Sequence, residues 1–280
     1  MFNKKRLIAL LTGTLLVGSL VSGCGSAGAN STSGSSSSKI TVSGSTSVGP
    51  TMEILAEDYQ KENDTTTIEV QQVGSSAGIT NTIDGTSQIG MSSRDLKDEE
   101  KSELKEYQIA IDGIAVITNS ANKVKDLTLQ QVKDIYTGKI TNWKEVGGAD
   151  AEIVVVSRED GSGTRDGFQE IVGFESKDLT SNAQISDGSG NIKTTVQGNE
   201  NAIGYISFGY LDDSINAVKI GGVEPKEENV YNDKYPISRP FLLVTNGEAS
   251  GDAKSFIDYI LSDAGQKTIE KQGFMSVNQK

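Results

Sequence analysis

Short apolar runs rich in β-branched residues alternate with amphipathic stretches over most of the chain. The apolar runs predict strands at residues 39–42, 66–73, 87–91, 108–111, 114–118, 152–156, 202–207, 217–220 and 241–244. Helical spacing of apolar residues predicts helices at 48–63, 129–137 and 253–271, and a further helix that begins near residue 164. Strands that alternate with helices indicate an α/β fold with mixed, mainly parallel sheets, in which ligands bind at the carboxyl ends of the strands.

Local signals refine three of these regions. Thr128 and Gln131 form a capping box at the start of the helix predicted at 129–137. The charged run at 97–105 predicts a solvated helix face. We expect Trp143 to pack in a core rather than to line a ligand cleft.

The N-terminus has the pattern of a lipoprotein signal peptide. Cations at 4–6 precede an uncharged stretch at 7–21, and small residues then lead to Cys24. The uncharged stretch is too short to span a bilayer comfortably. We therefore predict a signal peptide over residues 1–23, lipidation of Cys24 after cleavage, and a flexible tether rich in Gly and Ser over residues 24–38.

Composition narrows the function classes. The chain has 38 Asp and Glu against 26 Lys and Arg, a formal charge of −12 that argues against nucleic-acid binding. It contains no histidine, and Cys24 is its only cysteine, so the usual general base, the commonest zinc ligands and a thiol nucleophile are missing. We expect a binding protein rather than an enzyme, without a metal or a cofactor. About 240 residues from Lys39 onward suffice for a two-lobed protein with a sizeable core.

One loop has the composition of an anion site. Residues 157–165 read Ser-Arg-Glu-Asp-Gly-Ser-Gly-Thr-Arg between a predicted strand and a predicted helix. The first N–H groups of a helix lack partners and lie at the positive end of its dipole, so they can bind a tetrahedral oxyanion. Arg158 offers a planar fork that matches two oxygens, and Asp160 is placed to hold its guanidinium. Taken alone, the loop fits an ordinary helix N-cap and tight turn equally well.

Three more hydroxyl-rich loops follow predicted strands, at residues 43–47, 74–78 and 91–95. Each loop alone fits a capped helix start. Four such loops at equivalent places, two of them with an arginine, instead indicate convergent donors around a buried anion, which needs its oxygens hydrogen-bonded.

Four segments together resemble the phosphate-binding proteins that serve ATP-driven phosphate importers, in a lipoprotein form. They are Gly44-Ser45-Thr46, Gly74-Ser75-Ser76-Ala77-Gly78, Arg158-Glu159-Asp160-Gly161-Ser162-Gly163-Thr164 and Asn201-Ala202-Ile203-Gly204-Tyr205, and the resemblance runs over about residues 39–277. It implies the type II periplasmic-binding-protein fold, in which two α/β lobes joined by crossover strands hold the ligand in the cleft between them. It places lobe 1 at 39–116 and 241–280, and lobe 2 at 117–240.

The resemblance also implies which residues bind phosphate. They are Ser45, Thr46, Ser47, Ser75, Ser93, Arg94, Arg158, Ser162, Gly163 and Thr164. Asp160 would orient Arg158 without touching the ligand.

Ser93 departs from the best-known members of that family, which have an aspartate at this place. A carboxylate accepts the proton that phosphate carries near neutral pH and repels sulfate, which carries none, whereas a hydroxyl accepts a proton without repelling sulfate. Either selectivity against sulfate is weaker in this chain, or another carboxylate such as Asp95, Asp112 or Asp160 has taken over. Arg94 is either a second cation for the ligand or an ion-pair residue between or on the lobes.

We therefore expect a monomeric receptor, anchored through Cys24 on the extracytoplasmic face of a cell membrane, that closes on inorganic phosphate and delivers it to the permease of an ABC importer. One alternative is a surface adhesion or signalling protein that keeps the fold, and another is a binder of a different tetrahedral oxyanion such as sulfate. An enzyme acting on phosphate esters would need a metal site or a positioned base, and the sequence has no Gly-x-x-x-x-Gly-Lys-Ser/Thr loop and no dense acidic cluster.

Overall fold

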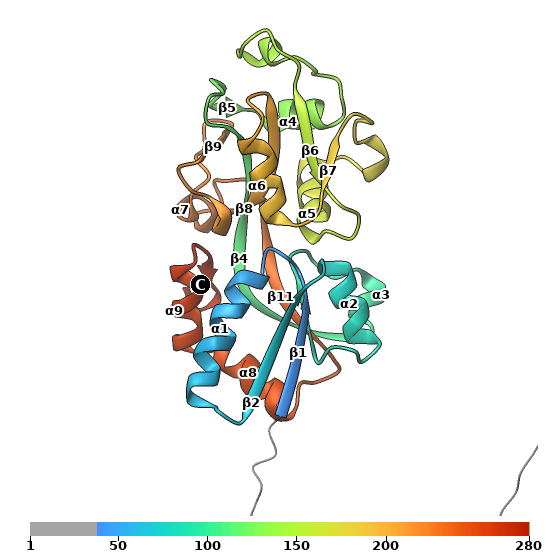
Figure 1. Cartoon of the computed structure of the whole chain (residues 1–280), viewed down its shortest axis with the longest axis vertical. Helices are drawn as coiled ribbons and strands as arrows, with labels where there is room; N and C mark the ends of the chain where they lie inside the picture. Colours follow the sequence, from blue (N-terminus) through green and yellow to red (C-terminus); the bar gives the residue numbers. More distant parts are fainter. Residues whose placement is uncertain (1–37, 280) are drawn as a thin grey trace, which may run out of the picture. The chain divides into compact units, whose positions relative to one another are not determined.

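The computed structural model describes residues 38–279, which form two lobes around separate hydrophobic cores (Figure 1). The strands of lobe 1 are β1 (Ser38–Gly44), β2 (Thr66–Gln72) and β3 (Ile89–Ser92), and its helices are α1 (Gly49–Glu62), α2 (Ser75–Ile83), α3 (Asp98–Lys101), α8 (Gly251–Leu261) and α9 (Asp263–Lys271). The α/β class predicted from the alternation of apolar runs and amphipathic stretches is confirmed.

Lobe 2 is built from the middle of the chain. Its strands are β5 (Asp126–Leu127), β6 (Val154–Arg158), β7 (Gln184–Ser186), β8 (Ala202–Ser207), β9 (Ile215–Ala217) and β10 (Lys219–Ile220). Its helices are α4 (Leu129–Tyr136), α5 (Gly163–Val172), α6 (Ser189–Gln197) and α7 (Glu227–Tyr231), with 3₁₀ turns η1 (Trp143–Val146), η2 (Ser176–Asp178) and η3 (Phe208–Tyr210).

Two long strands, β4 (Leu104–Asn119) and β11 (Ser238–Asn246), join the lobes, and the chain ends with β12 (Met275–Ser276) and η4 (Val277–Gln279) (Figure 1). On β4, Ala110 belongs to the core of lobe 1 and Ile114 to the core of lobe 2. The chain returns from lobe 2 to lobe 1 at β11: Ile237 belongs to the core of lobe 2 and Phe241 to the core of lobe 1. We call residues 111–113 and 238–240 the crossover segment.

The sheet runs through both lobes in the order β2-β1-β3-β11-β4-β8-β6-β7, with β9 and β12 paired to β4. Strand β1 is parallel to β2 and β3, and β6 is parallel to β7 and β8. Strands β4 and β11 are antiparallel to each other and to their neighbours β8 and β3. The central parallel strand of each lobe therefore ends at a hydroxyl-rich loop, after Gly44 in lobe 1 and after Arg158 in lobe 2.

Several local features predicted from the sequence are present in the structure. The buried face of α1 consists of its apolar residues, with Met52 and Leu55 fully covered. The Thr128 hydroxyl accepts a hydrogen bond from the Gln131 N–H at 3.1 Å, and the Gln131 side chain accepts one from the Thr128 N–H at 2.8 Å. Trp143 is buried in the core of lobe 2, and its indole N–H donates to the Asn201 carbonyl at 3.0 Å, which confirms the packing role.

Other predicted elements are wrong in extent. The strands predicted at 108–111 and 114–118 are one strand, β4, because the chain passes straight through the crossover segment. The helix predicted at 253–271 breaks at Ser262, whose hydroxyl caps α9 by accepting from the Gly265 N–H at 3.4 Å. The charged run at 97–105 holds only the four-residue α3, and β4 begins at Leu104, which is buried in a small apolar cluster of lobe 1.

The predicted signal peptide at 1–23, the lipidated Cys24 and the tether up to residue 37 lie outside the described residues. Among residues 38–279, no helix is both long and apolar enough to cross a membrane.

Candidate functional site

Four helices begin where the two lobes meet, and each follows a loop rich in small polar residues. Helices α1 and α2 start in lobe 1 after the ends of β1 and β2, and α5 and α6 start in lobe 2 after the ends of β6 and β7. Because the N-terminal end of a helix carries unpaired N–H groups and a partial positive charge, four such ends at one junction favour a bound anion.

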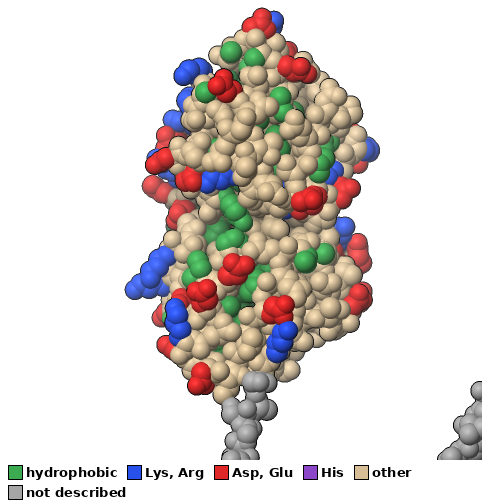
Figure 2. All heavy atoms as spheres, viewed as in Figure 1, with side chains coloured by type: hydrophobic (Ala, Val, Ile, Leu, Met, Phe, Trp, Pro, Cys, Tyr) green, Lys and Arg blue, Asp and Glu red, His purple; other side chains and the backbone are tan. Residues whose placement is uncertain are grey.

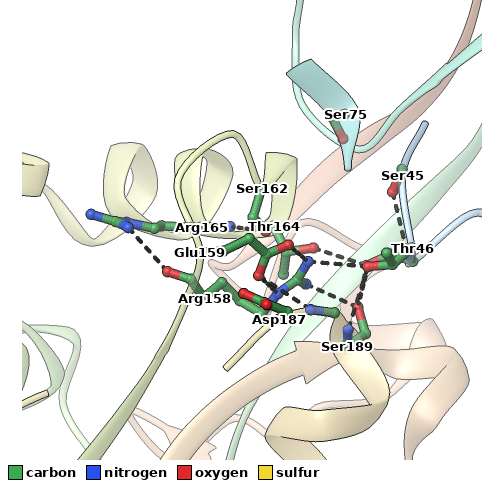
Figure 3. A network of polar contacts seen from close by, with 12 residues as sticks. Ser45, Thr46, Ser75, Arg158, Glu159, Ser162, Thr164, Arg165, Asp187 and Ser189 are labelled. Atoms are coloured by element: carbon green, nitrogen blue, oxygen red, sulfur yellow. Dashed lines mark hydrogen bonds and ion pairs between the residues drawn. The ribbon is translucent and has the colours of Figure 1, made fainter. Parts of the chain in front are cut away.

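Seven side-chain hydroxyls gather at this junction, and we call them the hydroxyl cluster. They belong to Ser45, Thr46, Ser47, Ser75, Ser93, Thr164 and Ser189, and Figure 3 labels all of these except Ser47 and Ser93. All are buried except Thr46, which is half-buried. The predicted binding residues Ser45, Thr46, Ser47, Ser75, Ser93 and Thr164 are thus brought together. Ser189, the first residue of α6, was not singled out by the sequence analysis.

Hydrogen bonds within the cluster cross from lobe to lobe. The Ser47 hydroxyl lies 2.8 Å from that of Thr164 and 3.0 Å from that of Ser189. On the lobe 1 side, the Ser45 hydroxyl donates to Ser93 at 2.9 Å, and Ser75 lies 3.3 Å from Ser93. A hydroxyl can both donate and accept, so the same groups that pair here can all turn their protons toward an anion.

Arg158, at the end of β6, is almost fully buried against the cluster. Its Nη1 donates to the Ser189 hydroxyl at 3.0 Å, and its Nη2 donates to the Thr46 hydroxyl at 3.1 Å (Figure 3). Arg158 therefore contacts both lobes, as expected of the guanidinium that the sequence analysis predicted to bind the anion.

The carboxylate that holds Arg158 is Glu159, and the prediction that Asp160 orients this arginine is wrong. The Arg158 guanidinium donates to both Glu159 oxygens, at 2.7 and 2.6 Å, and the Gly188 N–H donates to the same carboxylate at 3.2 Å. Burial raises the pKa of Glu159, but the hydrogen bonds and charge of Arg158 outweigh it, so the net pKa lies below the ordinary value and the carboxylate stays ionised.

Asp160 points away from the cluster. Its side chain is 94% exposed and pairs with Arg165 at 2.7 Å. Arg165 in turn donates to the backbone carbonyl of Arg158 at 3.0 Å (Figure 3). The turn at Gly161, with φ of 81°, reverses the chain directly after Asp160, which leaves that carboxylate on the outside of the loop.

The start of α5 lies directly against lobe 1. Ser162 is its N-cap, and its hydroxyl accepts from the Arg165 N–H at 3.3 Å. The Gly161 carbonyl accepts from the Ser76 N–H of α2 at 3.1 Å. A Cβ added at Gly163 would lie 2.3 Å from the Ser75 hydroxyl, so the two helix starts approach this closely only because residue 163 is glycine.

Arg94 is buried beside the cluster but is held by carboxylates. It donates to both oxygens of Glu100, at 2.8 and 2.9 Å, and its Nε lies 3.1 Å from Asp166 of lobe 2. The Arg94 guanidinium also donates to the Asp95 carbonyl at 2.8 Å and to the Ser76 hydroxyl at 3.3 Å. The structure therefore places Arg94 in an interlobe ion pair, the second of its two expected roles, and not among the cluster hydroxyls.

The three carboxylates considered as substitutes for an aspartate at position 93 do not reach the hydroxyl cluster. Asp95 is exposed, and Asp160 points outward. Asp112 is fully buried in the crossover segment, where its oxygens accept hydrogen bonds from Arg239, Ser207 and the Phe208 N–H.

Three residues of the junction escaped the sequence analysis, namely Glu159, Ser189 and Arg239. Glu159 lies within the loop at 157–165, next to Asp160, which the sequence analysis expected to hold Arg158. Ser189 follows β7, which has only three residues and is partly exposed, so no apolar run marked it. The Gly-Ser-Gly at 188–190 is the one signal that could have found it.

The junction is electrically balanced, because each of its arginines faces a carboxylate. Figure 2 shows acidic and basic side chains mixed over the face in view, so attraction of an anion is not supplied by a large field of one sign there. Within the described residues, no three acidic or cysteine side chains are grouped so as to hold a metal ion. The arrangement can bind a tetrahedral oxyanion locally, through hydroxyls, helix N-termini and the buried Arg158 guanidinium, whose Nη1 and Nη2 reach the cluster.

Known proteins are similar to this chain in sequence and in fold. Residues 29–264 match the family model described as a PBP superfamily domain. The phosphate-binding protein PstS of Bacillus subtilis is 38% identical over 245 residues, which cover 85% of this chain and 80% of the relative. The corresponding protein of Borreliella burgdorferi is 30% identical over 250 residues, covering 85% and 90%.

Two solved structures are also similar. A protein of Clostridium perfringens described as a phosphate ABC transporter substrate-binding protein, solved with bound phosphate, is 63% identical with a TM-score of 0.84 and covers 85% of this chain and 99% of that one. An ABC-type phosphate transport receptor of Vibrio cholerae is 39% identical with a TM-score of 0.73, covering 85% and 100%. Both likenesses extend over the two lobes and the crossover strands.

Proposed function

The chain belongs to the family of PstS phosphate-binding proteins, and from this premise we propose that it captures inorganic phosphate at the hydroxyl cluster and delivers it to an ABC importer. The two-lobed fold is the periplasmic-binding-protein fold of that family. The observation that carries the proposal is that two lobe 1 hydroxyls meet lobe 2 across the junction: Ser47 contacts Thr164 and Ser189, and Thr46 accepts from Arg158.

Phosphate fits the chemistry of these groups. Its four oxygens accept several hydrogen bonds, and a buried anion is stable only when those oxygens are paired. Hydroxyls of the cluster, the starts of α2, α5 and α6, and the Arg158 fork supply the donors. The start of α1 contributes the positive end of its dipole, because the N–H groups of Ser47, Val48 and Gly49 are bonded to Ser45. Ser162 contributes as the N-cap that orients the start of α5, and Gly163 contributes its backbone.

The division of donors between lobes makes capture a closing reaction. An ion bound to one lobe gains the remaining contacts only when the other lobe approaches, so phosphate shifts the population from open to closed. The permease of the importer then receives phosphate when the lobes separate. This function requires binding and release, without a catalytic step.

We further propose that the receptor works on the extracytoplasmic face of the membrane as a monomer, anchored by a lipid on Cys24 after the signal peptide is removed. The sequence pattern at 1–24 supports this part of the proposal. Mass spectrometry of the membrane-extracted protein tests it, since a diacylglyceryl thioether on an N-terminal Cys24 is expected and an unmodified thiol would contradict it.

Ser93 gives the ion no carboxylate acceptor, so we propose that the phosphate proton is accepted by a hydroxyl of the cluster. Such a site tolerates sulfate more than a site with a carboxylate does, because no negative charge repels the ion that lacks a proton. Sulfate is therefore expected to compete weakly but measurably.

Calorimetric titration of residues 36–280, which form one compact unit, tests the function. Saturable one-to-one phosphate binding supports the receptor, and sulfate is then titrated as a competitor at the same pH. No binding of phosphate would refute the proposal. Phosphate uptake by cells with and without this chain separates a transport receptor from an adhesion or signalling protein that has kept the fold, because only the former changes uptake.

A further inference from the structure

We propose that Arg239, on crossover strand β11, is a second cation of the phosphate site, and that it turns the Ser47 hydroxyl toward the ion. The inference rests on the proposed function. It assigns to the crossover segment a part in binding, beyond its part in joining the lobes.

Arg239 is held by Asp112 of the neighbouring crossover strand. The two residues are direct cross-strand partners in the antiparallel register of β4 and β11. Nε and Nη2 of Arg239 donate to Asp112 Oδ2 at 3.0 and 2.9 Å, and the two side chains are 2% and 0% exposed. The other oxygen, Oδ1, accepts from the Ser207 hydroxyl at 2.9 Å and the Phe208 N–H at 3.2 Å, both in lobe 2.

The rest of the Arg239 guanidinium reaches the hydroxyl cluster. Nη2 donates to the Ser47 hydroxyl oxygen at 3.2 Å, and Nη1 donates to the Ser93 backbone carbonyl at 3.1 Å. Both contacts are buried, and both partners belong to the lobe 1 half of the cluster. The Ser47 hydroxyl therefore lies between the Arg239 guanidinium and the hydroxyls of Thr164 and Ser189 in lobe 2.

The hydrogen bond from Arg239 determines the direction in which the Ser47 hydroxyl proton points. A hydroxyl has one proton and two lone pairs, and here a lone pair is engaged by a guanidinium N–H. The single proton of Ser47 must then point to the opposite side, where Thr164 and Ser189 lie. An anion among these groups meets Ser47 as a donor, and that donor is strengthened by the positive charge behind it.

Stability alone does not account for the pair. A fully buried ion pair commonly contributes no more than an apolar replacement, because removing two charges from water is costly. Burial lowers the pKa of Arg239, and the nearby charge of Arg158 lowers it further, although Asp112 opposes both effects. Arg158 and Arg239 both donate to hydroxyls of the cluster, Arg158 from lobe 2 and Arg239 from the crossover segment, so an ion bound there lies near two guanidinium groups.

Substitutions of the two members of the pair should have unequal effects on phosphate binding, and this difference separates the proposal from a purely structural role. Arg239→Gln removes the cation and is expected to weaken phosphate binding at least tenfold. Asp112→Asn keeps an oxygen for Ser207 and Phe208 but leaves Arg239 without a counter-charge, so phosphate binding should be as tight as in the wild type or tighter. A merely structural pair would lose affinity equally in both variants, because each breaks the same ion pair.

The experiment titrates inorganic phosphate into residues 36–280 of the wild type and of both variants, with thermal unfolding to show that each is folded. A tenfold loss in Arg239→Gln with no loss in Asp112→Asn supports the proposal, and equal losses or an unchanged Arg239→Gln overturn it. If Arg239→Gln does not fold, Arg239→Lys replaces it, with at least a threefold loss expected and less than twofold contradicting the inference. Failure of the wild type to bind phosphate would instead refute the proposed function itself.

Discussion

Gly163→Ala is expected to separate phosphate binding from folding. Gly163 is the first residue of α5 and has a negative φ, so alanine fits its backbone. Alanine is also the better helix former, by up to about 1 kcal/mol in a helix interior. We therefore expect the free energy of unfolding to stay the same or to rise slightly.

The effect on closure follows from the distance to lobe 1. The added Cβ would lie 2.3 Å from Ser75 Oγ and 2.8 Å from Ser75 Cβ, whereas real Cβ atoms essentially never approach within 3.0 Å. Rotation of Ser75 does not remove the clash with its Cβ, and Ser93 Oγ is 2.9 Å away on the same side. The lobes must then separate by about 0.7 Å at this point, the difference between 3.0 and 2.3 Å.

Such a separation breaks hydrogen bonds between the lobes. The Ser76 N–H to Gly161 carbonyl bond of 3.1 Å would lengthen to about 3.8 Å, and the bond from the Ser47 hydroxyl to an ion held by lobe 2 would lengthen by about the same 0.7 Å. Each bond is worth about 0.5–1.5 kcal/mol net. Loss of both therefore costs about 1–3 kcal/mol, which is roughly a 5- to 150-fold loss of phosphate affinity.

Calorimetry with phosphate measures the affinity, and thermal unfolding without phosphate measures the stability. Gly167→Ala is the matched control, because it adds the same methyl group to the same helix and its Cβ would come no closer than 3.6 Å to Arg239. It should bind phosphate like the wild type. If Gly163→Ala also binds within twofold of the wild type, the close approach of α5 to α2 is not needed for binding and the reasoning fails.

Three further predictions concern the charges and hydroxyls of the site. Arg158→Ala is expected to cost at least about 2 kcal/mol of phosphate affinity, since it removes one partner of a buried charged hydrogen-bond pair; a change under twofold in calorimetry would remove Arg158 from the site. Ser93→Asp should weaken sulfate binding at least tenfold while affecting phosphate much less, because the new carboxylate repels the ion without a proton, and equal losses for both ions would argue against selection by charge. Glu159 has a lowered pKa, so its contribution to stability is complete above its ordinary value of 4.5 and is lost as pH falls through the lower folded value. The advantage in thermal stability of wild type over Glu159→Gln should therefore shrink below about pH 4.5, and a constant difference from pH 7 to pH 3 would contradict the assignment.

Local features of the sequence predicted much of the site. Loops of small polar residues at the ends of strands indicated helix N-termini, and Ser45, Ser75 and Thr164 lie in the hydroxyl cluster as expected. These signals are readable because a helix cap or a tight turn depends on a few consecutive residues. The close approach at Gly163 belongs to the same kind of signal, since glycine marks a place where backbones come together.

Choices between neighbouring side chains could not be predicted in this way. Glu159 and Asp160 are both acids next to Arg158, and the sequence analysis chose the wrong one. The choice depends on the turn at Gly161 and on the Gly188 N–H, which comes from another loop and binds Glu159. Arg94 was ambiguous for the same reason, because Asp166, which makes its ion pair interlobe, lies in the other lobe.

By itself, the sequence determined the α/β class and the hydroxyl-rich loops that follow the strands, and it marked Arg158 as a candidate cation, because these features follow from periodicity and from short-range capping chemistry. Only the tertiary structure decided that Asp112 and Arg239 are partners, since strand register joins residues 127 positions apart. It also decided which hydroxyls face each other across the lobes. The residue type determines what a side chain can donate or accept, but the packing of the two lobes determines which partner it meets.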